Sequence, residues 1–387
     1  MSSSKFHRNI VILGSTGSVG RNAVQEILDH PDEFTVVGLV AKDNLPLLAE
    51  QASALHARFA LTTDSRHLDD LARLIPPDCQ ALAGEDALLD LVAREEVELV
   101  LCAIVGTAGI NAALAALAMG KTLALASKEI LCLAGELVLK AAKASTGGLV
   151  PVDSEHSALF QCLQGRQPQE IAKLWLTASG GPFRDLSRDR LAAVTVKQAL
   201  EHPNWSMGRK VTVDSASLMN KALELIEAHY LFSVPESKLG AVLHRQSKVH
   251  ALVELIDGTL IAQLSAPDMR MPIRYGLSYP HRLPGSVPVM SPMDLGQLDF
   301  APIDDNKFPA IPLARRALRD GGTMPAVLSA ANDVAVTAFL NGRLPFTRIW
   351  DVVEKTMDAF SPEPQRNLSQ LLQIDANARR RAAEFIP

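Results

Sequence analysis

Short apolar runs alternate with helical stretches over residues 8–150 of the chain. Strands are predicted at residues 9–13, 34–40, 97–104, 122–126 and 149–152. These runs are continuous rather than alternating, which is typical of a parallel sheet that helices cover on both faces. The pattern therefore predicts an α/β fold that begins with a Rossmann-type parallel sheet.

The pattern changes after residue 150. Residues 151–280 mix strands with helices and predict a central α+β domain. Seven prolines lie between Pro280 and Pro312, a density that disfavours regular structure and predicts a Pro-rich linker over residues 281–312. Helical periodicity over residues 313–387 predicts a C-terminal helical bundle. The expected domains are therefore residues 1–150, residues 151–280 and residues 313–387, and residues 281–312 link the last two.

Composition indicates a globular protein, with 48% hydrophobic and 21% charged residues over 387 positions. The formal net charge of -5 argues against non-specific binding of nucleic acid. The four cysteines are widely spaced, as expected for reduced thiols in a cytoplasmic protein. The polar N-terminus lacks the apolar block of a secretion signal.

Residues 99–119 carry no charge and are long enough to cross a bilayer. Gly106, Thr107, Gly109 and Asn111 interrupt this segment. A buried strand, a glycine turn and an Ala-rich helix explain it better, so no membrane association is expected.

A glycine-rich segment, Gly14 to Gly20, follows the first predicted strand and precedes a predicted helix. Glycines there permit a tight turn and the close approach of a pyrophosphate, and the helix N-terminus supplies N–H donors. The spacing is G-x-x-G-x-x-G rather than G-x-G-x-x-G, so a plain turn remains the alternative to a dinucleotide site.

The end of the second strand bears on the choice of dinucleotide. Lys42 there suits a ribose 2′-phosphate, whereas Asp43 suits a ribose hydroxyl. The local sequence leans slightly towards NADP.

Two carboxylates stand in Pro151-Val152-Asp153-Ser154-Glu155-His156. If the strand continues, Asp153 and Glu155 point to one side and His156 to the other. Neighbouring carboxylates repel unless a cation lies between them, and Mg²⁺ or Mn²⁺ prefers such oxygen ligands. A solvated turn is the alternative, and His156 is expected to have a supporting role.

A second polar cluster lies in residues 213–224. Read as a helix, this segment places Asn220, Lys221 and Glu224 on one face. With Ser215 they offer the donors that bind a phosphate, and Glu224 offers a third carboxylate. An ordinary surface Lys–Glu pair is the alternative.

Between the two clusters, residues 180–208 have glycines at both ends and predict a mobile flap. Trp205 near its tip is suited to covering a bound substrate. His202 nearby is interpreted either as a substrate-binding residue or as a structural one.

With these segments assembled, the chain resembles the 1-deoxy-D-xylulose 5-phosphate reductoisomerase family over nearly its whole length. The segments that carry the resemblance are residues 14–20, 126–129, 151–156, 179–184, 202–210, 213–224 and 267–270.

The resemblance implies an NADPH-binding N-terminal domain, a catalytic domain that also forms a homodimer, and a C-terminal helical bundle. It implies rearrangement of deoxyxylulose phosphate, a small phosphorylated sugar, and reduction by NADPH to 2-C-methyl-D-erythritol 4-phosphate, a step of non-mevalonate isoprenoid synthesis.

The resemblance also implies roles for individual residues. The expected ligands of Mg²⁺, Mn²⁺ or Co²⁺ are Asp153, Glu155 and Glu224. The expected phosphate-binding residues are Ser179, Ser215, Asn220 and Lys221. Other expected substrate contacts are Lys128, Ser154, Glu155, His202 and Trp205. The expected cofactor contacts are Thr16, Gly17, Ser18, Val19, Asn44, Ser127, Glu129 and Gly208.

The chain departs from the family in two places. Lys42-Asp43 stands where the family usually carries Gly-Lys, so Lys42 is expected to take over the 2′-phosphate. Ser127 replaces the usual Asn. A plain NAD(P)-dependent dehydrogenase of a phosphorylated aldehyde or hydroxy acid is the alternative function, but it gives no role to the three carboxylates.

Overall fold

The structure is a computed structural model that describes residues 6–203, 205 and 207–387. Outside the described residues lie Asn204, Ser206 and residues 1–5, which begin the polar N-terminus. The chain divides into two compact units. The first comprises residues 1–130, 138–157 and 268–288, and the second comprises residues 131–137, 158–267 and 289–387.

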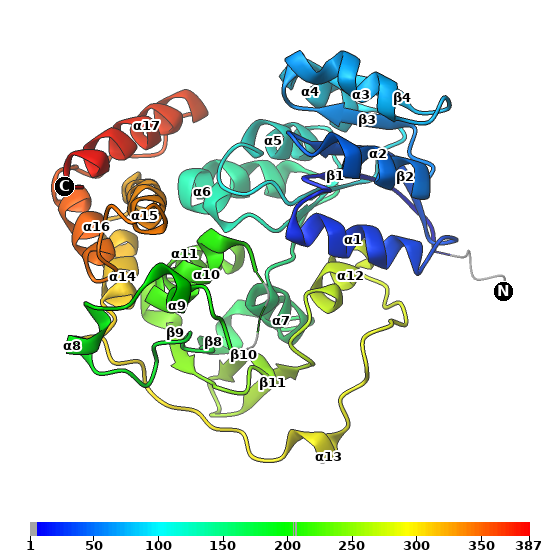
Figure 1. Ribbon diagram of the computed structural model, residues 1–387. Helices are drawn as coiled ribbons and strands as arrows, with labels where there is room; N and C mark the ends of the chain where they lie inside the picture. The colour runs from blue at the N-terminus through cyan, green and yellow to red at the C-terminus, as the bar shows by residue number, and fades with distance from the viewer. Residues whose placement is uncertain (1–5, 204, 206) are drawn as a thin grey trace. The chain divides into compact units, whose positions relative to one another are not determined.

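The first unit is built on a seven-stranded parallel sheet of order β4-β3-β2-β1-β5-β6-β7 (Figure 1). Its strands are β1 (Arg8–Leu13), β2 (Phe34–Ala41), β3 (Phe59–Thr62), β4 (Gln80–Ala83), β5 (Leu99–Cys102), β6 (Thr122–Leu125) and β7 (Leu149–Pro151). The five predicted strands are confirmed, as is the Rossmann-type sheet, whereas the four-residue strands β3 and β4 were not predicted.

Helices connect these strands, as a parallel sheet requires. They are α1 (Ser18–Leu28), α2 (Leu45–Ala54), η1 (Ser65–His67), α3 (Leu68–Leu74), α4 (Glu85–Ala93), α5 (Ile110–Ala118) and α6 (Lys128–Ala144). Ile10, Ile12, Leu39 and Leu99 are fully buried in the core of this unit. The continuous apolar runs of the strands reflect this burial on both faces.

The strand order creates the place for a ligand. The chain builds outwards from β1 to β4 and then returns to place β5 on the other side of β1. Such a reversal leaves a crevice at the carboxyl ends of the strands, where ligands bind in open α/β sheets.

A late segment completes the first unit. Helix α12 (Arg270–Ser278) lies beside α1 (Figure 1). Arg274 of α12 forms an ion pair with the buried Glu26 of α1 at 3.2 Å, and Arg8 Nη1 donates to the Leu277 carbonyl at 3.0 Å. These contacts explain why residues 268–288 belong to this unit.

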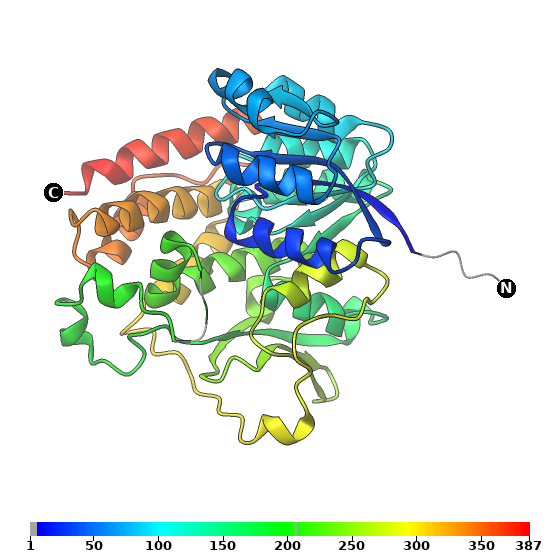
Figure 2. The same ribbon diagram turned by 45° about the vertical axis from the view of Figure 1, so that its right-hand side comes forward.

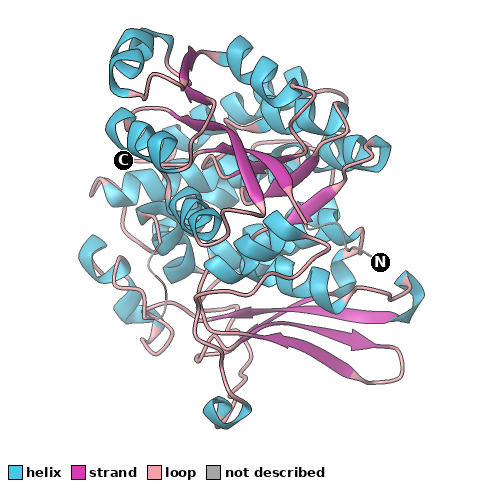
Figure 3. Cartoon of the chain, turned by 90° about the vertical axis from the view of Figure 1, so that its right-hand side faces the viewer, coloured by secondary structure: helices cyan, strands magenta, loops and turns pink. Residues whose placement is uncertain are grey.

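The second unit contains a four-stranded mixed sheet of order β11-β10-β8-β9, drawn as magenta arrows in Figure 3. Its strands are β8 (Ile171–Ala178), β9 (Leu239–Leu243), β10 (Val249–Leu255) and β11 (Leu260–Leu264). Its other elements before residue 270 are η2 (Pro168–Glu170), α8 (Arg188–Leu191), α9 (Val196–Ala199), α10 (Arg209–Ser217), α11 (Met219–Phe232) and η3 (Glu236–Lys238). Helix α7 (Ser154–Cys162) has residues in both units, as does α6.

The end of the chain is helical, as predicted (Figure 2). The helices are α14 (Ala310–Asp320), α15 (Met324–Leu340), α16 (Arg348–Asp358) and α17 (Leu368–Glu384). The Pro-rich segment before them contains one short helix, α13 (Pro292–Leu295).

Among the described residues, no helix is both long and apolar enough to cross a membrane. The uncharged segment 99–119 forms β5, a turn and α5, which accords with the strand, glycine turn and Ala-rich helix expected for it.

Candidate active site

The glycine-rich turn is packed too tightly for side chains at two positions. A Cβ on Gly14, whose φ is +85°, would lie 2.7 Å from the Ala103 carbonyl oxygen at the end of β5. A Cβ on Gly20 would lie 2.2 Å from the Gly14 carbonyl oxygen. Gln51 of α2 fixes the turn by donating to the Ser15 carbonyl at 3.0 Å. The turn is therefore held closely against the end of β5 and the start of α1.

Helix α1 begins directly at this turn. Gly17 is its N-cap residue, and Ser18 and Val19 are its first helical residues, with Thr16 just before. The N–H groups of a first turn have no partner within their helix, and the helix dipole makes this end positive. The expected cofactor residues of this segment thus lie at a helix N-terminus, a position suited to an anion.

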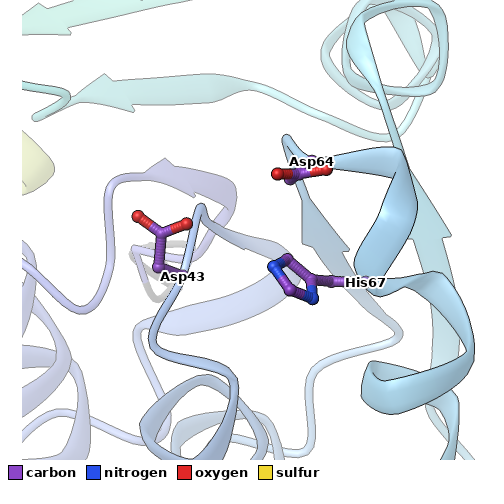
Figure 4. A group of neighbouring side chains, drawn as sticks. All are labelled: Asp43, Asp64 and His67. Atoms are coloured by element: carbon purple, nitrogen blue, oxygen red, sulfur yellow. The ribbon is translucent and has the colours of Figure 1, made fainter.

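The ends of β2 and β3 carry a cluster of charged side chains. Asp43, Asp64 and His67 each offer a polar atom within 4.8 Å of the others, and Figure 4 shows the three side chains around a common point. Arg66 donates to both oxygens of Asp64, at 2.9 and 2.6 Å, and these bonds hold the pKa of that carboxyl below its ordinary value. Lys42 is exposed beside Asp43. Charges of both signs therefore meet where a dinucleotide's ribose binds in such folds.

Asn44, another expected cofactor residue, has a structural task. Its side chain accepts from the Leu47 N–H at 3.3 Å and caps α2. Its amide N–H₂ group stays a candidate donor for a cofactor.

The carboxyl end of β6 leads into three of the expected site residues. Ser127 is the N-cap of α6, Lys128 and Glu129 open the helix, and all three are buried. Ser127 donates to the Ile104 carbonyl after β5. The Lys128 ammonium lies 2.5 Å from Asp153 Oδ2 at the end of the neighbouring strand β7. The sheet therefore aligns Lys128 and Asp153, which are 25 positions apart in sequence.

The expected strand through Asp153 and Glu155 is wrong. Strand β7 ends at Pro151, and α7 begins at Ser154 because the Asp153 carbonyl accepts the Ser157 N–H at 2.8 Å, the first bond of a helix. Ser154 Oγ donates to Glu155. Asp153 and Glu155 thus stand at a helix N-terminus rather than on one side of a strand.

The placement of His156 away from Asp153 is also wrong. Residues three apart on a helix share a face, and the buried His156 has Nδ1 4.0 Å from Asp153 Oδ2. His156 is therefore placed to support Asp153.

In the second unit, Ser179 and His202 are brought together at the two ends of the flap. His202 Nδ1 accepts the Trp205 N–H at 2.9 Å, and Nε2 lies 3.0 Å from Ser179 Oγ. Burial, followed by the charge of Arg184, lowers the pKa of His202 to about 4. The imidazole is thus neutral, and because Nδ1 accepts, Nε2 carries the proton and donates to Ser179.

This arrangement turns Ser179 into a donor. Its Oγ accepts from His202 and from the Gly181 N–H at 3.2 Å, so its own proton is directed to another acceptor. The ring of Trp205 lies 6.2 Å from that of His250 on β10, centroid to centroid.

The polar cluster at 213–224 is not one helix. Leu218, with φ of 60°, breaks the segment into α10 and α11, so Ser215 stands on a different helix from the other three residues. The predicted common face of those three is confirmed, since Asn220 and Lys221 donate to the two oxygens of the buried Glu224.

Both ends of the flap contact α10. Gly208 is the N-cap of α10. A Cβ on Gly181, whose φ is +63°, would lie 2.8 Å from the Ser215 carbonyl oxygen. The flap therefore starts against Ser215 and ends at the first turn of the same helix.

Two polar residues beside the site were missed from the sequence. Arg184 donates to the Ser179 carbonyl at 2.8 Å, and Lys210 forms ion pairs at the start of α10. Both residues lie in segments that carry the family resemblance, residues 179–184 and 202–210. That position was the signal in the sequence that could have identified them.

The expected residues thus form two groups, one in each unit. The first unit holds the glycine-rich turn, Lys128, Asp153 and Glu155 on one edge of its sheet. The second holds Ser179, His202, Trp205, Ser215, Asn220, Lys221 and Glu224.

The comparisons with known proteins agree over nearly the whole chain. A family model described as 1-deoxy-D-xylulose 5-phosphate reductoisomerase matches residues 10–135. Models of the C-terminal domains of the same family match residues 149–232 and 264–381.

Individual relatives cover nearly full length. The chain is 44% identical over 379 residues to the 1-deoxy-D-xylulose 5-phosphate reductoisomerase of Thermodesulfovibrio yellowstonii, covering 98% of this chain and 99% of the relative. It is 47% identical to that of Moorella thermoacetica, covering 97% of each. The Zymomonas mobilis reductoisomerase solved with NADPH superposes with a TM-score of 0.92 at 40% identity, covering 98% of each chain.

A DOX-P reductoisomerase solved with NADPH, fosmidomycin and magnesium also gives a TM-score of 0.92, at 37% identity and 98% coverage of each chain. With the glycine-rich turn, the carboxylates after β7 and the phosphate-type donors of α10 and α11 all in place, these matches show that the chain belongs to the 1-deoxy-D-xylulose 5-phosphate reductoisomerase family.

Proposed function

We propose that the chain rearranges 1-deoxy-D-xylulose 5-phosphate and reduces the product to 2-C-methyl-D-erythritol 4-phosphate, with NADPH and a divalent metal. The observation that carries this proposal lies within the first unit. The glycine-rich turn after β1 and the Lys128–Asp153 pair after β6 and β7 stand on the same edge of one parallel sheet. This shared edge supports a reductant site and a charged reaction site on the same sheet.

The donor set fits a hard divalent cation. Asp153 already attracts the Lys128 ammonium, and Glu155 follows in the first turn of α7. In the second unit, Glu224 is buried and holds two donors on its oxygens. We assign Asp153, Glu155 and Glu224 as ligands of Mg²⁺, Mn²⁺ or Co²⁺, because carboxylate oxygens are what these ions prefer.

When bound, the metal supplies Lewis-acid polarisation of the ketone and NADPH supplies the hydride. The chain's own residues orient the substrate between them. Lys128 offsets the charge of Asp153, and Ser154 provides a hydroxyl next to Glu155. Lys128 and Ser154 are both placed to contact the substrate at the oxygen-bearing carbons whose bonds rearrange.

The second unit binds the phosphate in this proposal. Ser179 directs its proton outwards because His202 and Gly181 already donate to it. Ser215, Asn220 and Lys221 add a hydroxyl, an amide and an ammonium, which together match a phosphate's acceptors. Phosphate binding supplies remote binding energy for flap closure, and Trp205 then excludes water from the reactive aldehyde.

The domains divide these tasks. Residues 1–150 bind NADPH, residues 151–280 bind metal and substrate and form the dimer, residues 281–312 link, and residues 313–387 support the phosphate-binding helices. Free cysteines, three of them buried, suit a cytoplasmic protein.

The protein is expected to be a homodimer. Strand β11 is an edge strand of the four-stranded sheet and exposes Leu260. Val289 and Met293 of the same unit are 93% and 88% exposed, and these apolar side chains with the open edge of β11 support the expected interface. Sedimentation equilibrium should give the dimer mass, and Leu260→Lys should shift it towards the monomer, whereas Ser187→Lys should not. A monomeric wild-type protein would contradict this expectation.

The function is tested by mixing the protein with deoxyxylulose phosphate, NADPH and Mg²⁺ and following NADPH absorbance. NADPH should be consumed with formation of methylerythritol phosphate, EDTA should stop the reaction, and added Mg²⁺ or Mn²⁺ should restore it. A plain dehydrogenase would survive chelation. Absence of turnover with every divalent metal would refute the proposal.

Lys42→Ala should weaken NADPH binding by about fivefold and leave NADH binding within about twofold, since a 2′-phosphate contact to an exposed lysine is worth about 1 kcal/mol. Titration of cofactor fluorescence measures both affinities. Lys173→Ala in the second unit is the control. Equal effects on both cofactors would remove Lys42 from the 2′-phosphate site.

Acid should weaken the fold through His202. Its pKa is lowered to about 4 in the folded protein, so its stabilising effect is fully present above the ordinary value of 6.5 and is lost as pH falls from there towards 4. Between about pH 7 and pH 5, wild type should lose about 1 kcal/mol more unfolding free energy than His202→Asn, after allowance for solvent screening. Urea unfolding at the two pH values measures this. Parallel losses in both proteins would contradict it.

A further inference from the structure

Lys210 stands at the point where the flap joins α10, two residues after the N-cap Gly208. Its ammonium lies 3.1 Å from Asp214 Oδ2, one turn later in the same helix, and 2.9 Å from Asp333 Oδ1 on α15. One cation therefore joins the phosphate-binding helix to the C-terminal helices, across more than a hundred positions of sequence.

The acceptors of Lys210 are themselves fixed. Asp214 is almost fully buried, and its other oxygen accepts from Asn332 Nδ2 at 2.8 Å. Burial raises the pKa of Asp214, and the charge of Lys210 opposes that rise. Two neighbouring residues of α15, Asn332 and Asp333, thus contact α10 side by side.

The connection continues to the last helix. Asp333 Oδ2 accepts from Arg379 Nη2 of α17 at 2.9 Å, and Arg379 also binds Asp375 of its own helix, Nε to Oδ2, at 2.6 Å. At the other end of α10, the Trp350 indole N–H of α16 donates to the Ser217 carbonyl at 3.1 Å. Two C-terminal helices, α15 and α16, therefore contact α10 at its two ends, and α17 braces α15 through Asp333.

This anchoring matters because α10 carries Ser215 and contacts both ends of the flap. Ser215 is adjacent to Asp214, and the flap begins against Ser215 at Gly181 and ends at Gly208. A shift or rotation at the start of α10 therefore moves a phosphate donor and both flap ends together.

We propose that Lys210 is a positioning residue: through Asp333 it sets the start of α10, so that the C-terminal helices hold Ser215 and the flap in register for the substrate phosphate. This inference rests on the proposed function of Ser215 and the flap. It predicts that removing the Lys210–Asp333 contact weakens the binding of the phosphorylated substrate more than it lowers the turnover rate of the bound substrate.

The test compares Lys210→Met, Asp333→Asn and Lys210→Arg in the full-length protein. The first two should raise the KM for deoxyxylulose phosphate by about tenfold while kcat falls by less than about threefold. Calorimetric titration of deoxyxylulose phosphate without NADPH should show the same loss of affinity, and the affinity for NADPH should stay unchanged. Lys210→Arg, which keeps a cation between the two carboxylates, should restore KM to within about threefold.

Asp358→Asn is the matched control, because it breaks the Arg316–Asp358 pair between α14 and α16 and leaves α10 untouched. A Lys210→Met protein with a lower melting temperature but unchanged KM and substrate affinity would overturn the proposal. If Lys210→Met does not fold, the comparison of Asp333→Asn with Asp358→Asn tests the proposal by the same criteria. If the wild type is active and the variants behave like it, the role of Lys210 is refuted and the proposed function stands. If the wild type is inactive, the proposed function itself is refuted.

Discussion

Replacing Glu224 by Gln should reduce kcat/KM by about a thousandfold or more, because a neutral amide of the same shape cannot supply an anionic metal ligand. Glu224 is buried, and Asn220 and Lys221 donate to its two oxygens. The variant should also lose about 3 kcal/mol of stability, since the buried Lys221 loses this counter-charge. Steady-state kinetics, titration of Mn²⁺ and thermal unfolding measure the three effects.

Glu236→Gln is the control for this substitution. Glu236 forms an ion pair with Arg315 at 2.5 Å in the same unit, and its loss should leave kcat/KM within about twofold. Retained turnover and unchanged Mn²⁺ affinity in the Glu224→Gln protein would remove Glu224 from the ligand set.

Gly20→Ala should weaken NADPH binding by about a hundredfold and destabilise the protein by about 3 kcal/mol. The added Cβ would lie 2.2 Å from the Gly14 carbonyl oxygen and 2.5 Å from Ser15 Cα, which are backbone atoms and cannot rotate away. The turn or the start of α1 must therefore move, and with it the N–H groups offered to the pyrophosphate. Titration of NADPH fluorescence and urea unfolding measure these losses.

Gly148→Ala separates this steric effect from ordinary strain. Gly148 has φ of +75° but no neighbouring atom within 4 Å of the added Cβ, so the variant should lose about 1 kcal/mol of stability and bind NADPH normally. A Gly20→Ala protein that binds NADPH like wild type would show that the turn does not hold the cofactor.

The sequence determined those features that depend on neighbours along the chain. Continuous apolar runs predicted five of the seven strands, because strands buried on both faces cannot alternate. Strands β3 and β4 were missed because their apolar runs, residues 59–61 and 81–83, stop after three positions. Helical spacing also placed Asn220, Lys221 and Glu224 on one face, as the contacts of Glu224 confirm.

Local patterns failed where one element ends and the next begins. Strand alternation was extended from Pro151 to His156, although α7 begins at Ser154. Helical spacing was extended across Leu218, although a single left-handed residue there separates α10 from α11. A pattern of apolar positions does not show which residue adopts a rare backbone angle, because that depends on what the two helices pack against.

Tertiary structure alone decided which distant polar groups meet. Lys128 reaches Asp153 because β6 and β7 are neighbours in the sheet, and His202 reaches Ser179 only because the segment between them folds back. Lys210 reaches Asp333 because α15 packs against α10. The sequence by itself determined the residue types of the site and the helical face that Asn220, Lys221 and Glu224 share. Its long-range contacts arise only from packing, since no local periodicity relates residues so far apart.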